Sequence, residues 1–140
     1  MSFNWAEYLH LAEELTGIAN SIAGEEARLR STISRAYYAA FIRARNYLRH
    51  QDLDLPRNGD VHRYVRDYFD RSSNELHRMI ANDLARLRIS RNRADYDDIM
   101  TQLPVLARMS LKLAARVLAN LDELLLQQRQ ALLKSEVKRP

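Results

Sequence analysis

Apolar residues recur at helical spacing along almost the whole of this 140-residue chain. They lie three or four positions apart, which places them on one face of an α-helix, and glycine and proline, which interrupt helices, occur only three times each. This pattern predicts an all-α fold, an antiparallel up-and-down bundle of four to five helices. No linker, repeat or low-complexity tract divides the chain. We therefore expect a single domain over residues 1–140, with a frayed tail over about residues 134–140.

The apolar spacing predicts five helices, over about residues 4–22, 25–50, 60–71, 72–89 and 104–134. Capping boxes, in which a polar side chain at the helix start is followed by glutamate three positions on, are expected at Asn4 with Glu7 and at Ser72 with Glu75. The spacing weakens after Ile89. Residues 90–98 are therefore predicted to form a connection between helices or the start of one.

Basic residues are concentrated in the middle of the chain. Residues 28–93 hold 15 arginines and seven acids, a balance of +8, against −5 for residues 1–27 and +1 for residues 94–140, which together give the formal charge of +4. Of the 22 basic residues, 19 are arginine, whose planar guanidinium binds phosphate or carboxylate in a bidentate manner. Phosphate contacts and ordinary solvated helix faces both account for this bias.

Several function classes lack their sequence signatures. The absence of cysteine excludes a disulfide framework and a thiolate metal site, and no cofactor is expected. No apolar run approaches the roughly 20 residues of a membrane span, and the acidic N-terminal stretch is unlike a signal peptide, so we expect no membrane association and a cytoplasmic protein. The histidines lack the spacing of zinc ligands and lie among polar residues, which predicts surface imidazoles at His10, His50, His62 and His77.

The densest charged cluster lies near residues 86–98, where arginine recurs every second or third residue at Arg86, Arg88, Arg91 and Arg93. At a break between helices, backbone amides and guanidinium groups can converge on one phosphate, which makes this cluster a candidate anion site. Alternatively, Asp95 and Asp97 pair with the arginines and lock the connection without a ligand. A third interpretation has Asp95, Asp97 and Asp98 holding Mg²⁺, although acids are common at a helix start.

Two neighbouring tyrosines, Tyr37 and Tyr38, lie in the middle of the second predicted helix with arginines nearby. A tyrosine on an apolar helix stripe is more often part of the core than a platform for base stacking. The Tyr37 hydroxyl can also reach the polar edge of a cleft. Both interpretations of Tyr37, core residue and ligand contact, remain open at this stage.

Two sequence segments occur in order. The first reads Ser34-Arg35-Ala36-Tyr37-Tyr38-Ala39-Ala40-Phe41, and the second, about fifty residues later, reads Leu87-Arg88 and then Arg91-Asn92-Arg93-Ala94-Asp95-Tyr96. Together they resemble the HEPN superfamily (higher eukaryote and prokaryote nucleotide-binding) over about residues 5–130. The resemblance implies an antiparallel helical bundle that forms a two-fold homodimer. It also implies RNA or nucleotide binding and metal-independent endoribonuclease activity in prokaryotic toxin–antitoxin or antiviral defence, with a nucleotidyltransferase as a possible antitoxin partner.

The ribonuclease signature of that superfamily is an arginine, a polar residue after it, and a histidine four to six positions beyond the arginine. Arg91 matches the arginine and Asn92 the polar residue, whereas Tyr96 stands where the histidine would be, and no histidine follows His77. The resemblance therefore implies Arg91, Asn92 and Tyr96 as catalytic residues. It implies a set of RNA- or phosphate-binding residues as well, namely Arg88, Arg93 and Tyr37.

In the cleavage reaction that the resemblance implies, the 2′-hydroxyl attacks the adjacent phosphate. Arg91 would stabilise the phosphorane charge, Asn92 would orient the phosphate and Tyr96 would protonate the leaving 5′-oxygen, with the base unassigned. In related toxins a tyrosine two residues after the histidine accepts a silencing modification, and Asp98 occupies that position here. The alternative is a non-catalytic interaction protein, a HEPN scaffold that pairs with a nucleotidyltransferase or another defence partner and uses the same cluster as a structural lock.

Overall fold

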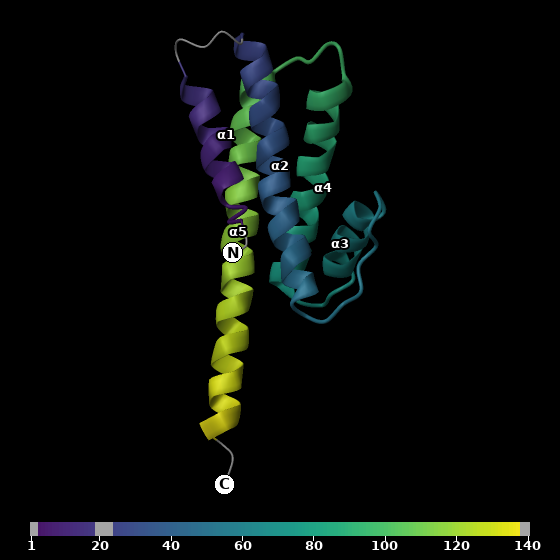
Figure 1. Cartoon of the computed structure of the whole chain (residues 1–140), viewed down its shortest axis with the longest axis vertical. Coiled ribbons are helices and arrows are strands. Elements are labelled where there is room, and N and C mark those ends of the chain that lie inside the picture. Colours follow the sequence, from purple (N-terminus) through teal and green to yellow (C-terminus); the bar gives the residue numbers. More distant parts are fainter. Residues whose placement is uncertain (1–2, 19–23, 138–140) are drawn as a thin grey trace.

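The computed structural model describes residues 3–18 and 24–137. All regular structure in these residues is helical, in five helices, which are α1 (Glu7–Gly17), α2 (Glu25–Arg49), α3 (Val61–Asp70), α4 (Glu75–Tyr96) and α5 (Leu103–Val137). Figure 1 shows α1, α2, α4 and α5 running alternately up and down beside one another, with the short α3 against one flank of the bundle. The antiparallel helical bundle predicted from the sequence is confirmed.

Helix α2 is the centre of the bundle, because it contacts all four other helices. Its buried face carries small side chains, and the four that are fully buried are Ala36, Ala39, Ala40 and Ala44. Alanine side chains allow a neighbouring helix backbone to approach closely, and larger residues from the neighbours fill the remaining space. A second, smaller core at the α2 N-terminal end joins Ile33, Ala94, Leu103 and Ala107.

The helix starts differ from the two predicted capping boxes. The side-chain oxygen of Asn4 accepts a hydrogen bond from the Ala6 amide at 3.1 Å, but α1 begins later, at Glu7. At the start of α4 the cap is Asn74, whose side chain accepts hydrogen bonds from the amides of Leu76 and His77. The Ser72 hydroxyl instead accepts from the Asn74 amide at 3.1 Å. Ser72 therefore orders the turn that leads into the cap.

Helix α4 continues through residues 90–96, which the sequence predicted to be a connection or a helix start. The prediction is wrong because ion pairs, rather than an apolar stripe, support this end of the helix. Arg91 pairs with Asp95 at 2.8 Å and Arg93 with Asp97 at 3.6 Å, each across one helical turn. The motif residues of the sequence analysis therefore lie on a continuous helix.

Arg30 of α2 caps the C-terminal end of α4 through its guanidinium group. Its Nη1 donates to the carbonyl oxygens of Ala94 at 2.9 Å and Asp97 at 2.6 Å, and its Nη2 donates to that of Asp98 at 3.3 Å. Carbonyl groups at a helix C-terminus have no partner within the helix and carry partial negative charge, so a guanidinium stabilises them. One arginine of the basic segment thus has a structural role.

The remaining helix ends also differ in part from expectation. Helix α1 ends at Gly17, and residues 19–22 of the predicted first helix lie outside the described residues. Helix α5 continues to Val137, beyond the predicted fraying point at Lys134, and residues 138–140 lie outside the described residues.

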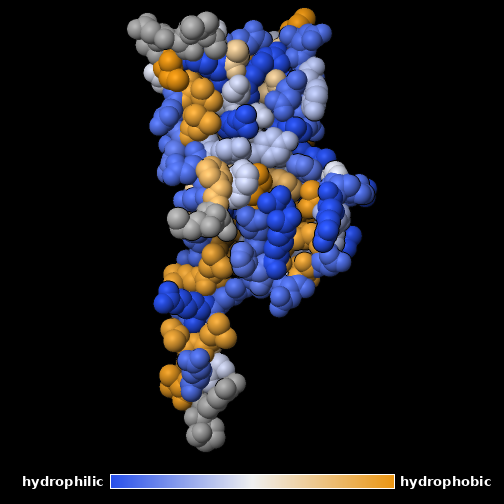
Figure 2. All heavy atoms as spheres, viewed as in Figure 1, coloured by the Kyte–Doolittle hydropathy of each residue, from blue (hydrophilic) through white to orange (hydrophobic). Residues whose placement is uncertain are grey.

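The C-terminal half of α5 extends well beyond the bundle (Figure 1). Apolar side chains are exposed along this extension, where Figure 2 shows orange patches, and they include Leu125, Leu126, Leu132, Leu133 and Val137. Even so, none of the helices in the described part of the chain is long and apolar enough to cross a membrane.

A buried ion pair joins α4 to α5. Asp83 of α4 is 1% exposed, and its two carboxylate oxygens accept hydrogen bonds from Nη2 and Nε of Arg116 at 2.6 and 2.7 Å. The carboxylate raises the pKa of Arg116 by these hydrogen bonds and by its charge. The Arg116 side chain is itself half-exposed, so the buried charge of the pair is mainly that of the Asp83 carboxylate.

Removing Arg116 should therefore destabilise the protein more than removing Asp83. Arg116→Ala leaves a buried carboxylate without its partner, for which we expect a loss of about 3 kcal/mol in the free energy of unfolding. Asp83→Ala leaves only a half-exposed guanidinium that water can solvate, so the loss should be smaller. Urea denaturation followed by circular dichroism measures both losses.

The double variant Asp83→Ala/Arg116→Ala should be more stable than Arg116→Ala alone, because it no longer buries an unpaired charge. Lys112→Ala, which removes a positive charge from an exposed position one turn earlier on α5, is the matched control. A double variant no more stable than Arg116→Ala would contradict the view that the unpaired Asp83 carboxylate is what destabilises Arg116→Ala.

Candidate functional site

Helices α2, α3 and α4 surround a cleft of about 250 Å³, which we call the polar cleft. Three residues singled out by the sequence line it, namely Tyr37, Arg88 and Asn92. The other lining residues are Phe41, His62, Arg66, Leu84, Ala85 and Ile89. The polar cleft thus combines two arginines, an imidazole, an amide and a phenol on an apolar floor.

Helical periodicity explains how these side chains meet. Each helix contributes a pair four residues apart, and such residues share one helix face. The pairs are Tyr37 with Phe41 on α2, His62 with Arg66 on α3, and Arg88 with Asn92 on α4. The polar cleft is therefore formed by one face of each of three helices.

Tyr37 is a core residue whose hydroxyl also faces the polar cleft. Its side chain is 2% exposed and packs in the core, stacked on Phe41 with ring centroids 5.7 Å apart. Its hydroxyl nevertheless reaches the polar cleft, where it shares a hydrogen bond of 2.5 Å with Nδ1 of His62. Burial raises the pKa of Tyr37, so the phenol stays protonated at neutral pH.

His62 is not the surface imidazole that the sequence predicted. Its ring stacks on Phe41 with centroids 4.1 Å apart and planes at 12°. Burial lowers the pKa of His62 to about 4, assisted by the positive charges of Arg88, Arg91 and Arg45. The imidazole is therefore neutral at physiological pH, and the polar cleft around it is strongly cationic.

A sequence signal for His62 existed. His62 lies three residues before Val65 and seven before Phe69, both fully buried, so the three residues share the inward face of α3. The helical spacing of Val65 and Phe69 therefore predicts that His62 also faces the core. Arg66 had no comparable signal, because its role depends on which helices pack beside α3.

The other three predicted site residues lie beside the polar cleft. The guanidinium carbon of Arg91 is 5.1 Å from the Tyr38 ring centre and 5.7 Å from that of Tyr96, and its Nη1 donates to Asn92 Oδ1 at 2.9 Å. Arg91 is thus adjacent to the polar cleft through Asn92. Tyr96, 74% exposed, and Arg93, paired with Asp97, do not line it.

The structure contains elements of both interpretations of the arginine cluster. Asp95 pairs with Arg91 and also accepts a hydrogen bond from the Ser34 hydroxyl at 3.4 Å, so it links α4 to α2 as a structural lock would. Arg88, in contrast, forms no ion pair within the described residues and faces the polar cleft. The lock involves Arg91, whereas Arg88 is available for an anion.

Two further expectations change with the continuous α4. Backbone amides at a helix break cannot contribute to an anion site, because the helix does not break there. The trio Asp95, Asp97 and Asp98 does not form a metal-binding group either. Across residues 3–18 and 24–137, no cluster of three or more histidine, aspartate or glutamate side chains is arranged to hold a metal ion.

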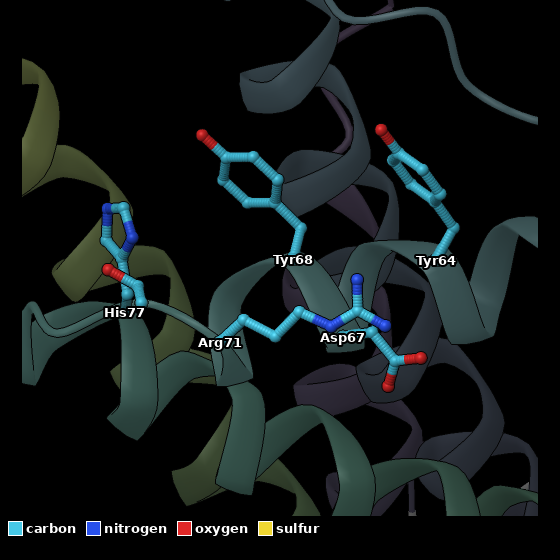
Figure 3. Close-up of a pocket in the computed structure, with 6 residues that line it drawn as sticks. Tyr64, Asp67, Tyr68, Arg71 and His77 are labelled. Carbon is cyan, nitrogen blue, oxygen red and sulfur yellow. The ribbon is translucent and has the colours of Figure 1, made fainter.

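A second hollow, of about 400 Å³, lies between α3 and the start of α4. Figure 3 shows Tyr64, Asp67 and Tyr68 projecting from α3, with Arg71 at its end and His77 on α4. Burial lowers the pKa of His77, a second histidine that the sequence placed at the surface. None of the site residues predicted from the sequence lines this hollow.

Comparison with known families agrees with this geometry. The family model described as the HEPN domain matches residues 8–124. The chain belongs to the HEPN family. No curated protein and no solved structure matches the chain. The match includes all three helices of the polar cleft and ends at Leu124, the last buried residue of α5. Membership associates this HEPN domain with a nucleotide- or RNA-related function.

Acid should destabilise this HEPN domain partly through His62. The pKa of His62 is about 4 in the folded chain and about 6.5 when unfolded, so the unfolded state binds more protons between these values. The contribution of the neutral His62 imidazole to the free energy of unfolding is fully present above about pH 6.5 and is lost as the pH falls towards 4. His77, with its pKa also lowered, adds to the same slope.

The melting temperature should therefore fall less steeply between about pH 6.5 and 4 in His62→Phe than in the parent, because phenylalanine keeps the stacked ring and cannot titrate. Differential scanning calorimetry over this range measures both slopes. Identical slopes would show that His62 titrates normally in the folded protein.

Proposed function

We propose that this HEPN domain binds RNA, with one backbone phosphate held in the polar cleft. The observation that carries the proposal is the convergence of Arg66, Arg88 and Asn92 on one preformed hollow. Guanidinium groups bind phosphate through paired N–H donors, and an amide adds a donor that fixes its orientation. Family membership associates the chain with this class of ligand.

The electrostatics of the polar cleft support an anionic ligand. Positive charges from Arg88, Arg91 and Arg45 lower the pKa of His62, so they act together on the interior of the cleft. Arg88 has no carboxylate partner among the described residues that would neutralise it. A phosphate would supply the missing negative charge.

Residues beside the polar cleft extend the proposed surface along α4. Arg93 is partly exposed, and the exposed Tyr96 ring offers a face on which a base can stack. Arg91 lies between them and the cleft and donates to Asn92. The catalytic roles predicted for Arg91, Asn92 and Tyr96 belong to this same proposal.

Arg88→Ala should weaken binding of a fluorescein-labelled single-stranded RNA by about tenfold or more, because hydrogen bonds to a charged group contribute about 1.5–3 kcal/mol. Arg91→Ala and Arg93→Ala should weaken it as well. Since bound phosphates release counterions, affinity should fall by orders of magnitude between about 50 and 200 mM salt. Fluorescence anisotropy measures each affinity.

Two exposed arginines outside the cleft serve as controls. Arg86 lies on α4 two residues before Arg88 and so faces away from the cleft, and Arg129 lies on the extension of α5. Neither Arg86→Ala nor Arg129→Ala should change the affinity appreciably. Equal losses in all variants would indicate diffuse charge attraction. Absence of binding at low salt would favour the non-catalytic HEPN scaffold, in which Arg91 and Arg93 only form their ion pairs with Asp95 and Asp97.

We also propose that the domain forms a two-fold homodimer with the ends of both α4 helices near the axis. Two large apolar residues are exposed along this end of α4 and just beyond it, namely Ile89 at 63% and Ile99 at 84%. An isologous contact would bury the same stripe on both copies. The two polar clefts would then lie close to each other.

Ile99→Glu should convert the dimer into a monomer, because the two-fold axis places both introduced charges in one interface. Light scattering after size-exclusion chromatography gives the mass of each variant. Leu132→Glu, at an exposed apolar position on the α5 extension, is the matched control and should remain dimeric. A monomeric parent, or dissociation by Leu132→Glu instead, would contradict this arrangement.

A further inference from the structure

We infer that His62 supplies the proton acceptor that the Arg91–Tyr96 segment lacks, so that the polar cleft cleaves the RNA it binds. The inference rests on the proposed function, because it assumes a phosphate beside Arg88 and Asn92. The acceptor comes from α3, a different helix from the one that carries the motif.

The geometry of His62 suits this role. Nδ1 is engaged by the Tyr37 hydroxyl at 2.5 Å, and the ring is stacked on Phe41, so position and orientation are both fixed. Nε2 has no hydrogen-bond partner among the described residues and is not closed off from solvent. Arg88 and Asn92, the proposed phosphate contacts, line the same hollow.

The reaction is a transesterification in which every atom is accounted for. In the tautomer with its proton on Nδ1, His62 donates to the Tyr37 oxygen and presents the Nε2 lone pair. Nε2 takes the proton of the RNA 2′-hydroxyl as the 2′-oxygen forms a bond to phosphorus. The bond from phosphorus to the 5′-oxygen breaks, and that oxygen takes the proton of the Tyr96 hydroxyl, which is the donor in the proposed function. The Tyr96 phenolate regains a proton from the imidazolium by way of water, which leaves a 2′,3′-cyclic phosphate and a 5′-hydroxyl.

Charge in the polar cleft adjusts the basicity of His62 when RNA binds. In the free protein burial keeps the imidazole neutral, and the positive charges of Arg88, Arg91 and Arg45 add to this effect, so the acceptor is available. Tyr37 and Tyr38 of α2 and Arg66 of α3 also surround the ring. A bound phosphate offsets the arginine charges and raises the pKa of His62, which makes it a stronger base in the complex.

Tyr37 is a positioning residue in this scheme. Its protonated hydroxyl holds the imidazole through Nδ1 and does not touch the RNA in the proposed arrangement. Phe41 fixes the plane of the ring. Tyr37→Phe removes only the hydroxyl, so it should lower the maximal cleavage rate with little change in RNA affinity.

The main test is cleavage of an end-labelled RNA in the presence of EDTA. The parent should cleave it, and His62→Ala should lose about 100-fold or more of the rate, the lower range of what a general base contributes. Added imidazole should restore part of the rate, because it can occupy the space left by the side chain. A purely structural histidine would not be rescued in this way.

Matched variants separate proton transfer from folding and from binding. His62→Phe keeps a ring on Phe41, and the double variant Tyr37→Phe/His62→Phe also removes the hydroxyl that would otherwise lose its partner. Both should melt near the parent temperature, bind RNA with little change in anisotropy and fail to cleave. A 2′-deoxy nucleotide at the mapped cleavage position should block cleavage by the parent and preserve binding.

The pH dependence gives a second readout. The acidic limb of kcat/KM reports His62 in the free protein and should lie at lower pH than the acidic limb of kcat, which reports the complex with its bound phosphate. Coincident limbs would contradict the proposed effect of the phosphate on His62.

The outcomes that would overturn the role of His62 differ from those that would overturn RNA binding. RNA binding without cleavage by the parent, or full cleavage by His62→Phe, would overturn the role of His62 and leave the proposed function intact. Loss of cleavage in Tyr96→Phe with retention in His62→Phe would overturn the role of His62 and support the proton donation proposed for Tyr96. Cleavage abolished by EDTA would overturn a metal-independent reaction. No RNA binding at low salt would overturn the proposed function itself.

Discussion

Close packing against the alanines of α2 is the constraint on which the rest of the structure depends. Four fully buried alanines leave little side chain between α2 and its neighbours, so the helices approach closely enough for short side chains to meet across them. From this central helix, the hydroxyl of Tyr37 reaches His62 on α3 and that of Ser34 reaches Asp95 on α4. A larger residue at any of these alanine positions would overpack the core and shift the helices that surround α2.

The fold class could be predicted from the sequence because the apolar periodicity of each helix is contained in that helix's own residues. The prediction failed at residues 90–96 because that end of α4 is stabilised by ion pairs and by Arg30, neither of which produces an apolar stripe. The spacing of Arg91 with Asp95 and of Arg93 with Asp97, four residues each, was a usable helical signal. The contribution of Arg30 was not, since it comes from a residue more than sixty positions away in the chain.

The candidate site was predictable only in part, for a related reason. Tyr37, Arg88 and Asn92 belong to segments that resemble the HEPN superfamily, and the structure brings these three together. Arg66 and His62 complete the cleft from α3, and no pattern within α3 indicates that this helix packs beside α2 and α4. The spacing of His62 to Val65 and Phe69 predicts that it faces inward, but the partner that it meets there is a property of the tertiary structure.

The short α3 carries two of the five polar groups of the cleft, His62 and Arg66, on the least anchored part of the bundle. A helix of ten residues is marginal by itself, and burial of Val65 and Phe69 is what holds it in place. We therefore expect α3 to open locally at a lower free energy than global unfolding, so that its amide hydrogens exchange faster than those of α2. In the opened state His62 and Arg66 leave the cleft, whereas Arg88 and Asn92 stay on the long α4. The side of the cleft on α3 therefore opens more often than the side on α4.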